Sequence, residues 1–136
     1  MKKIIKFLPV IAAIMTLVIM TSITASAADS TVKPMYSQTG SISMSLRFNS
    51  GTAHCSVTVL SNDRSIPIVN GEVTLTDSSG TVLATWSNLY ASDGILTFYK
   101  TYSPVEKGET YTMTIKATVV GKYSTEKISE EYTNTY

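Results

Sequence analysis

The chain of 136 residues is nearly neutral, with 11 Lys and Arg against 10 Asp and Glu, and it contains a single His and a single Cys. Binding to nucleic acid or to an anionic membrane surface requires clustered basic side chains, and this balance of charges excludes such a footprint. One Cys cannot form an internal disulfide, so the stability of the fold has to come from packing.

The first residues have the pattern of an export signal. Three lysines among the first six residues precede an apolar stretch from Phe7 to Met20, and Ala25-Ser26-Ala27 supplies a small-x-small cleavage site. We interpret residues 1–27 as a cleaved signal peptide, and we expect a secreted, extracellular protein that meets the membrane only during export. A retained anchor is the alternative, because the apolar stretch approaches the length that spans a bilayer. Cleavage removes three basic residues and leaves a net charge of −2.

Residues 28–40 are mostly small and polar, which predicts a flexible N-terminal segment ahead of a domain that covers residues 41–136. Two runs of alternating apolar and polar residues follow, from Ile42 to Phe48 and from Ala53 to Val59. The four residues between them, Asn49 to Thr52, have turn composition. This pattern predicts a β-hairpin.

The middle of the chain predicts a second hairpin. Ile66 to Val69 is apolar but contains a proline, which favours an edge segment, and Asn70-Gly71 has the composition of a tight turn. Beyond it, a strand through Val73 and Leu75 and a strand that places Val82, Ala84 and Trp86 on one face are joined by a turn at Asp77 to Gly80. Leu89 to Gly94 is interpreted as a loop.

The longest run of period two lies between Gly108 and Val120, with apolar residues on one face and threonines on the other. It predicts a half-buried strand at the centre of a sheet. Leu96 and Phe98 open the strand before it, and Thr125 to Thr133 forms the last one. About seven short strands and no helix after the leader predict an all-β fold, an immunoglobulin-like antiparallel β-sandwich. The predicted inward set is Leu46, Cys55, Val57, Leu75, Trp86, Phe98, Tyr111, Met113 and Ile115.

Three segments, residues 71–80, 93–98 and 108–113, resemble the immunoglobulin-like and prealbumin-like modules of bacterial surface and secreted proteins. Together with residues 51–55 and 85–87 they also resemble a family of short secreted proteins of Gram-positive bacteria whose function is unknown. The resemblance implies the fold and the export but no activity.

The position of Tyr111 resembles the tyrosine corner of immunoglobulin-like domains, in which a phenol tethers the loop before a strand. Two features depart from the antibody-type pattern. Cys55 has no partner cysteine, and Trp86 comes too late after Cys55 to be the tryptophan of such a domain.

His54 and Cys55 are adjacent on a predicted strand, so their side chains point to opposite faces and cannot form a catalytic pair. We interpret Cys55 as a small buried hydrophobe and His54 as a solvated residue, with a reactive thiol as the alternative for Cys55. The remaining candidates for acid–base chemistry are carboxylates near predicted loops. They are Asp77, Asp93, Glu106 and Glu109.

The spacing of these carboxylates selects no pair, and Asp before Ser or Gly is ordinary turn chemistry. Calcium at Asp77 to Gly80 or at Asp93 is the metal alternative, but too few ligands are in sequence reach. We therefore expect no catalytic residue, no cofactor and no metal site.

Tyrosines are the most suggestive feature, because the chain has eight and several fall outside the inward pattern. We predict that Tyr99, together with Tyr90 or Tyr123, forms a binding surface for cell-envelope or host glycans or proteins, since exposed Tyr can stack on sugar rings or anchor a protein partner. Ordinary sheet surface is the competing interpretation. The predicted function is a secreted, non-enzymatic binding module. A small secreted hydrolase using the loop carboxylates and a secreted toxin-like antagonist are the alternatives, and the sequence does not specify an oligomeric state.

Overall fold

The computed structural model describes residues 36–136, so the predicted signal peptide and most of the predicted flexible segment lie outside the described residues. Residues 36–136 contain seven strands and no helix long and apolar enough to cross a membrane. The predicted all-β class is confirmed. The strands are β1 (Thr39–Asn49), β2 (Thr52–Ser61), β3 (Ile68–Thr76), β4 (Val82–Ala91), β5 (Ile95–Tyr102), β6 (Thr110–Val120) and β7 (Thr125–Thr135).

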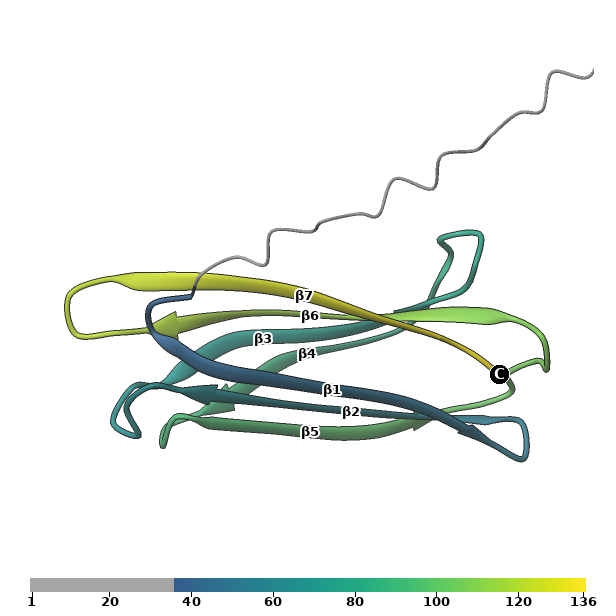
Figure 1. Ribbon diagram of the computed structural model, residues 1–136, viewed down its shortest axis with the longest axis horizontal. Helices are drawn as coiled ribbons and strands as arrows, with labels where there is room; N and C mark the ends of the chain where they lie inside the picture. Colours follow the sequence, from purple (N-terminus) through teal and green to yellow (C-terminus); the bar gives the residue numbers. More distant parts are fainter. Residues whose placement is uncertain (1–35) are drawn as a thin grey trace, which may run out of the picture. The chain divides into compact units, whose positions relative to one another are not determined.

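The strands form two antiparallel sheets that pack face to face (Figure 1). One sheet has the order β1-β2-β5 and the other has the order β4-β3-β6-β7. An immunoglobulin domain of the constant type likewise keeps its first, second and fifth strands in one sheet and its third, sixth and seventh in the other. The fourth strand differs, because β4 here pairs with β3 rather than with β5. The predicted immunoglobulin-like sandwich is confirmed, and β6 is an interior strand as expected.

The core lies between the two sheets and follows the period-two alternation of the strands. On β6, residues 111, 113, 115, 117 and 119 are buried, while the threonines between them face outward. Eight of the nine residues predicted to point inward are at most 4% exposed. The ninth, Trp86, is half-buried on the edge strand β4, with its ring centroid 5.3 Å from that of Phe98.

A tyrosine corner closes the loop between β5 and β6, as the resemblance implied. The backbone N–H of Glu106 donates to Tyr111 Oη at 2.9 Å, and the Tyr111 side chain is buried. Val105, next to Glu106, is buried as well. The loop is therefore fixed against the core at both positions.

The predictions for residues 66–71 are wrong. Ile68 begins β3, which is an interior strand, and it pairs with Ala91 on β4 and with Val119 on β6. Pro67 precedes the strand, so its missing N–H removes no sheet hydrogen bond. Asn70 and Gly71 lie inside β3 at a bulge, where Asn70 has a φ of 52°. A Cβ at Gly71 would lie 2.7 Å from the Cβ of Leu89, so the neighbouring strand requires glycine there.

Two predictions for β4 are also wrong. Residues 89–91 are not part of a loop, because β4 continues to Ala91 and only residues 92–94 form the connection to β5. Val82 does not share the inward face of Trp86. The register shifts between Leu75 and Thr76, and Val82 becomes 57% exposed. In both cases an irregularity in the sheet breaks the simple alternation that the sequence suggests.

The start of β1 is held by a carboxylate on β7. β1 begins at Thr39, two residues before the predicted domain boundary, and Thr39 is buried. Glu126 accepts hydrogen bonds from the Thr39 backbone N–H at 2.9 Å and from Thr39 Oγ1 at 2.7 Å, and also from the backbone N–H groups of Ser37 and Gln38. Burial raises the pKa of the Glu126 carboxyl, but these hydrogen bonds outweigh it and hold the pKa below its ordinary value.

Candidate functional site

Tyr99 lies on β5 and points away from the core, on the outer face of the three-stranded sheet. Its side chain is 59% exposed, yet its phenol oxygen lies 2.7 Å from Nδ1 of His54 on β2. The two ring centroids are 6.2 Å apart with an interplanar angle of 34°. The hydrogen bond therefore holds an exposed aromatic ring in a defined orientation.

Small hydroxyl side chains surround this pair. The strand register aligns Ser45 on β1 and Ser56 on β2 with Tyr99, and it aligns Ser43 and Thr58 with Thr97 in the next outward row. A third row aligns Arg47 on β1 with His54 on β2 and Thr101 on β5, and Arg47 is the only Lys, Arg, Asp or Glu in the three rows. The outward residues of the rows, which we call the Tyr99 face, are Ser43, Ser45, Arg47, His54, Ser56, Thr58, Thr97, Tyr99 and Thr101.

The other two predicted tyrosines do not lie on the Tyr99 face. Tyr90 is 64% exposed on β4, and its neighbours Leu89 and Ala91 point to the core, so Tyr90 points out of the four-stranded sheet on the other side of the sandwich. Tyr123 is 90% exposed in the connection between β6 and β7, with the Nζ of Lys122 5.1 Å from its ring centroid. The structure thus separates the three tyrosines instead of bringing them together.

Cys55 is a free thiol with no exposed surface, as predicted. Burial raises the pKa of this thiol to about 11, which keeps it protonated at neutral pH. His54 points to the opposite face of the same strand and contacts Tyr99. The prediction that His54 and Cys55 cannot pair is confirmed, but His54 has a partner that the sequence did not reveal.

Two of the loop carboxylates, Asp77 and Asp93, accept hydrogen bonds from residues of their own turns. Asp77 accepts hydrogen bonds from Ser79 Oγ at 2.6 Å and from the backbone N–H groups of Thr81 and Ser79 at 2.9 Å, and these bonds lower the pKa of its carboxyl. Asp93 accepts a long bond of 3.4 Å from the N–H of Ile95. Asp77 and Asp93 flank opposite ends of β4.

Glu109 accepts hydrogen bonds from the backbone N–H and the hydroxyl of Ser78. The last of the four carboxylates, Glu106, is exposed in the same loop between β5 and β6. Among residues 36–136, no three His, Cys, Asp or Glu side chains are grouped closely enough to hold a metal ion.

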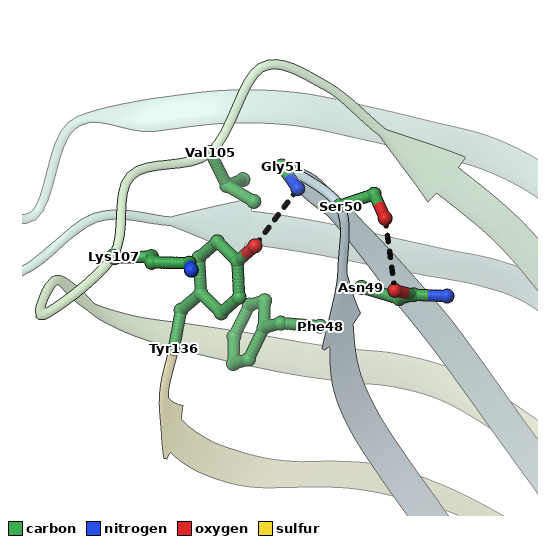
Figure 2. Close-up of a pocket in the computed structure, with 7 residues that line it drawn as sticks. All are labelled: Phe48, Asn49, Ser50, Gly51, Val105, Lys107 and Tyr136. Carbon is green, nitrogen blue, oxygen red and sulfur yellow. Dashed lines mark hydrogen bonds between the residues drawn. The ribbon is translucent and has the colours of Figure 1, made fainter.

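A hollow of about 640 Å³, which we call the end pocket, lies where the turn between β1 and β2 meets the loop between β5 and β6 (Figure 2). Its seven lining residues are Phe48, Asn49, Ser50, Gly51, Val105, Lys107 and Tyr136. The sequence indicated the turn at residues 49–52, but it gave no sign that Tyr136, from the far end of the described chain, would pack against it.

Comparisons with known proteins do not assign a family. No family model matches the chain, and no curated protein matches it. Among solved structures, the chain is similar to a β-D-glucuronidase from Dictyoglomus thermophilum, with 14% identity, a TM-score of 0.39, and coverage of 68% of this chain and 14% of that one. It is also similar to a β-glucuronidase from Ruminococcus gnavus, with 15% identity, a TM-score of 0.36, and coverage of 68% and 15%. A protein from Archaeoglobus fulgidus is 13% identical, with a TM-score of 0.41 and coverage of 72% and 97%. This chain spans only about a seventh of the glucuronidases, and similarity at this level carries no function.

Proposed function

We propose that this protein is an exported, non-enzymatic binding module that recognises glycans of the cell envelope or of a host surface through the Tyr99 face. The observation that carries the proposal is the 2.7 Å contact between Tyr99 Oη and His54 Nδ1, which orients an exposed ring. Exposed tyrosines without such a contact are common on sheet surfaces and need no functional explanation.

The chemistry of the Tyr99 face matches a sugar. An aromatic ring offers a flat apolar surface and a polar tip, which suits the C–H face and the hydroxyls of a pyranose. The rows of Ser and Thr beside Tyr99 place further hydroxyl groups at the spacing of neighbouring strands, about 4.8 Å, where each can donate or accept a hydrogen bond. The restraint from His54 reduces the conformational entropy that the ring loses when a ligand binds.

Glycans fit this face better than a protein partner does. Protein interfaces are centred on several buried apolar anchors, and the Tyr99 face supplies one aromatic pair among small hydroxyl residues. Its single guanidinium, on Arg47, gives little electrostatic attraction, so binding should depend weakly on salt. Two of the four loop carboxylates support a non-enzymatic role, since Asp77 and Glu109 are engaged in hydrogen bonds with turn residues.

The test compares three single variants, Tyr99→Ser, Tyr90→Ser and Tyr123→Ser, on an array of envelope and host polysaccharides. We expect the parent to bind at least one glycan and Tyr99→Ser to weaken that binding about tenfold or more, as for a residue that contributes over 1 kcal/mol. Tyr90→Ser and Tyr123→Ser should bind like the parent, because Tyr90 lies on the four-stranded sheet and Tyr123 lies in the connection between β6 and β7. The proposal fails if a folded Tyr99→Ser variant keeps every glycan of the parent, or if the parent binds proteins alone.

A further inference from the structure

The end pocket is held in shape by bonds that link three distant parts of the chain. Gly51 accepts from the N–H of Val105 at 2.9 Å and donates its own N–H to Tyr136 Oη at 2.9 Å. The backbone of Tyr136 is bonded to the loop between β5 and β6 as well, through Gly108 at 2.8 Å and Glu109 at 3.0 Å. A ligand would therefore meet a site that is already formed.

The floor of the end pocket is aromatic. The rings of Phe48 and Tyr136 are stacked, with their centroids 5.2 Å apart and an interplanar angle of 30° (Figure 2). Phe48 also contacts the corner tyrosine, Tyr111, at 5.4 Å, which connects the floor to the core. Because Phe48 stacks on Tyr136 and also packs on Tyr111, the flat apolar surface left for a ring-shaped ligand is that of Tyr136.

The polar groups at the edge of the floor are donors. Tyr136 Oη accepts the Gly51 N–H, so its own O–H proton remains to be donated, and no residue from 36 to 136 accepts it. Lys107 lines the same hollow, and its ammonium group has three donors and no acceptor. In contrast, Asn49 turns its carbonyl oxygen to Ser50 and its amide nitrogen away from the aromatic pair.

No acidic side chain is among the seven lining residues. Two glutamates are close in the sequence, but one of them is engaged elsewhere, because the Glu109 carboxylate binds Ser78 in the turn between β3 and β4. The other, Glu106, is exposed and is not among the lining residues. Lys107 therefore carries the only charged side chain among the seven lining residues.

From the stacked floor and the two donors, we propose that the end pocket binds a small molecule, or the end of a polymer, in which a carboxylate is attached to a ring. The ring lies against the Tyr136 ring, which is packed on Phe48, and the carboxylate accepts from the Lys107 ammonium group and the Tyr136 O–H. The ring can be aromatic or a sugar, since both have a flat face that fits the floor. This site is separate from the Tyr99 face and does not depend on the function proposed for it.

The test uses the backbone amide resonances of the secreted protein, with benzoate and galacturonate as probes and with benzamide and galactose as their neutral counterparts. We expect at least one carboxylate at millimolar concentration to shift the Gly51 resonance in a saturable way, and its neutral counterpart to bind at least fivefold more weakly. A stronger effect of benzoate identifies an aromatic acid as the ligand class, and a stronger effect of galacturonate identifies a sugar acid. If neither carboxylate shifts Gly51, or if the neutral probes bind equally well, the proposal is wrong.

Lys107→Met keeps most of the aliphatic side chain and removes the charge, so it should weaken binding of the effective probe about tenfold. Lys122→Met is the matched control, because Lys122 lies in the connection between β6 and β7, at the other end of these strands, and it should change nothing. Equal affinity in Lys107→Met and the parent would contradict the assigned contact. Tyr99→Ser should bind the probe like the parent, so the two proposals fail independently.

Discussion

Replacing Ile115 with alanine tests the packing of the sandwich at its centre. Ile115 has no exposed surface, and it lies on the interior strand β6 opposite Val73 on β3. The substitution removes three buried carbons, each contributing about 0.8 kcal/mol, and it adds the cost of the cavity left behind. We expect a loss of about 2–5 kcal/mol from a domain stability of about 5–15 kcal/mol.

Thermal and urea unfolding measure this loss. A decrease of 2 kcal/mol corresponds to a melting temperature about 8–16 °C lower for a domain of this size. Thr114→Ala is the matched control, since Thr114 is the next residue on β6 and faces outward between Thr74 and Glu131. It should cost under about 1 kcal/mol, the range of strand propensities. Equal melting temperatures for Ile115→Ala and the parent would refute the assigned strand face.

Two further predictions concern the buried thiol and the carboxylate at the start of β1. Cys55 should react slowly with a thiol reagent in the native protein and rapidly in denaturant, because the thiol is buried and its pKa is about 11. Fast labelling of the native protein, or a covalent dimer, would show that the thiol is exposed. The folded-state pKa of Glu126 lies below its ordinary value of 4.5, so its stabilising contribution is present above that pH and is lost as the pH falls through the folded-state pKa. The free energy of unfolding, measured with urea, should therefore fall more steeply for the parent than for Glu126→Gln on acidification below about pH 5. Parallel pH profiles for the two proteins would disprove the carboxylate anchor.

The alternation of apolar and polar residues was enough to predict most of the fold. On β6 apolar residues alternate with Thr and Lys, so the sequence alone indicates which face is buried. The bulge at Asn70 and Gly71 could not be predicted in this way. Asn followed by Gly is typical of a tight turn and is also compatible with a bulge, in which Asn70 adopts its left-handed φ. Only the pairing of β3 with β4 and β6 distinguishes the bulge from the turn.

The candidate sites depend on contacts between distant segments, which local patterns do not encode. His54 and Tyr99 are 45 residues apart, and they meet because β2 and β5 pair in a register that aligns His54 with Thr101. The sequence identified Tyr99 as exposed but not its partner. The end pocket requires the turn at Gly51, the loop at Val105 and the packing of Tyr136, and each of these segments alone has only the features of a turn, a loop or a strand end.

The comparison of the three predicted tyrosines gives a physical reason why the proposed binding surface is the one that contains Tyr99. Tyr90 and Tyr123 are at least as exposed as Tyr99, so exposure alone does not select a site. Tyr99 differs because His54 restrains its ring and because hydroxyl side chains lie beside it on two neighbouring strands. A free aromatic side chain loses rotamer entropy when a ligand orders it, whereas a ring that is already oriented loses less. The same stacking contact therefore yields more binding free energy at Tyr99 than at an unrestrained tyrosine.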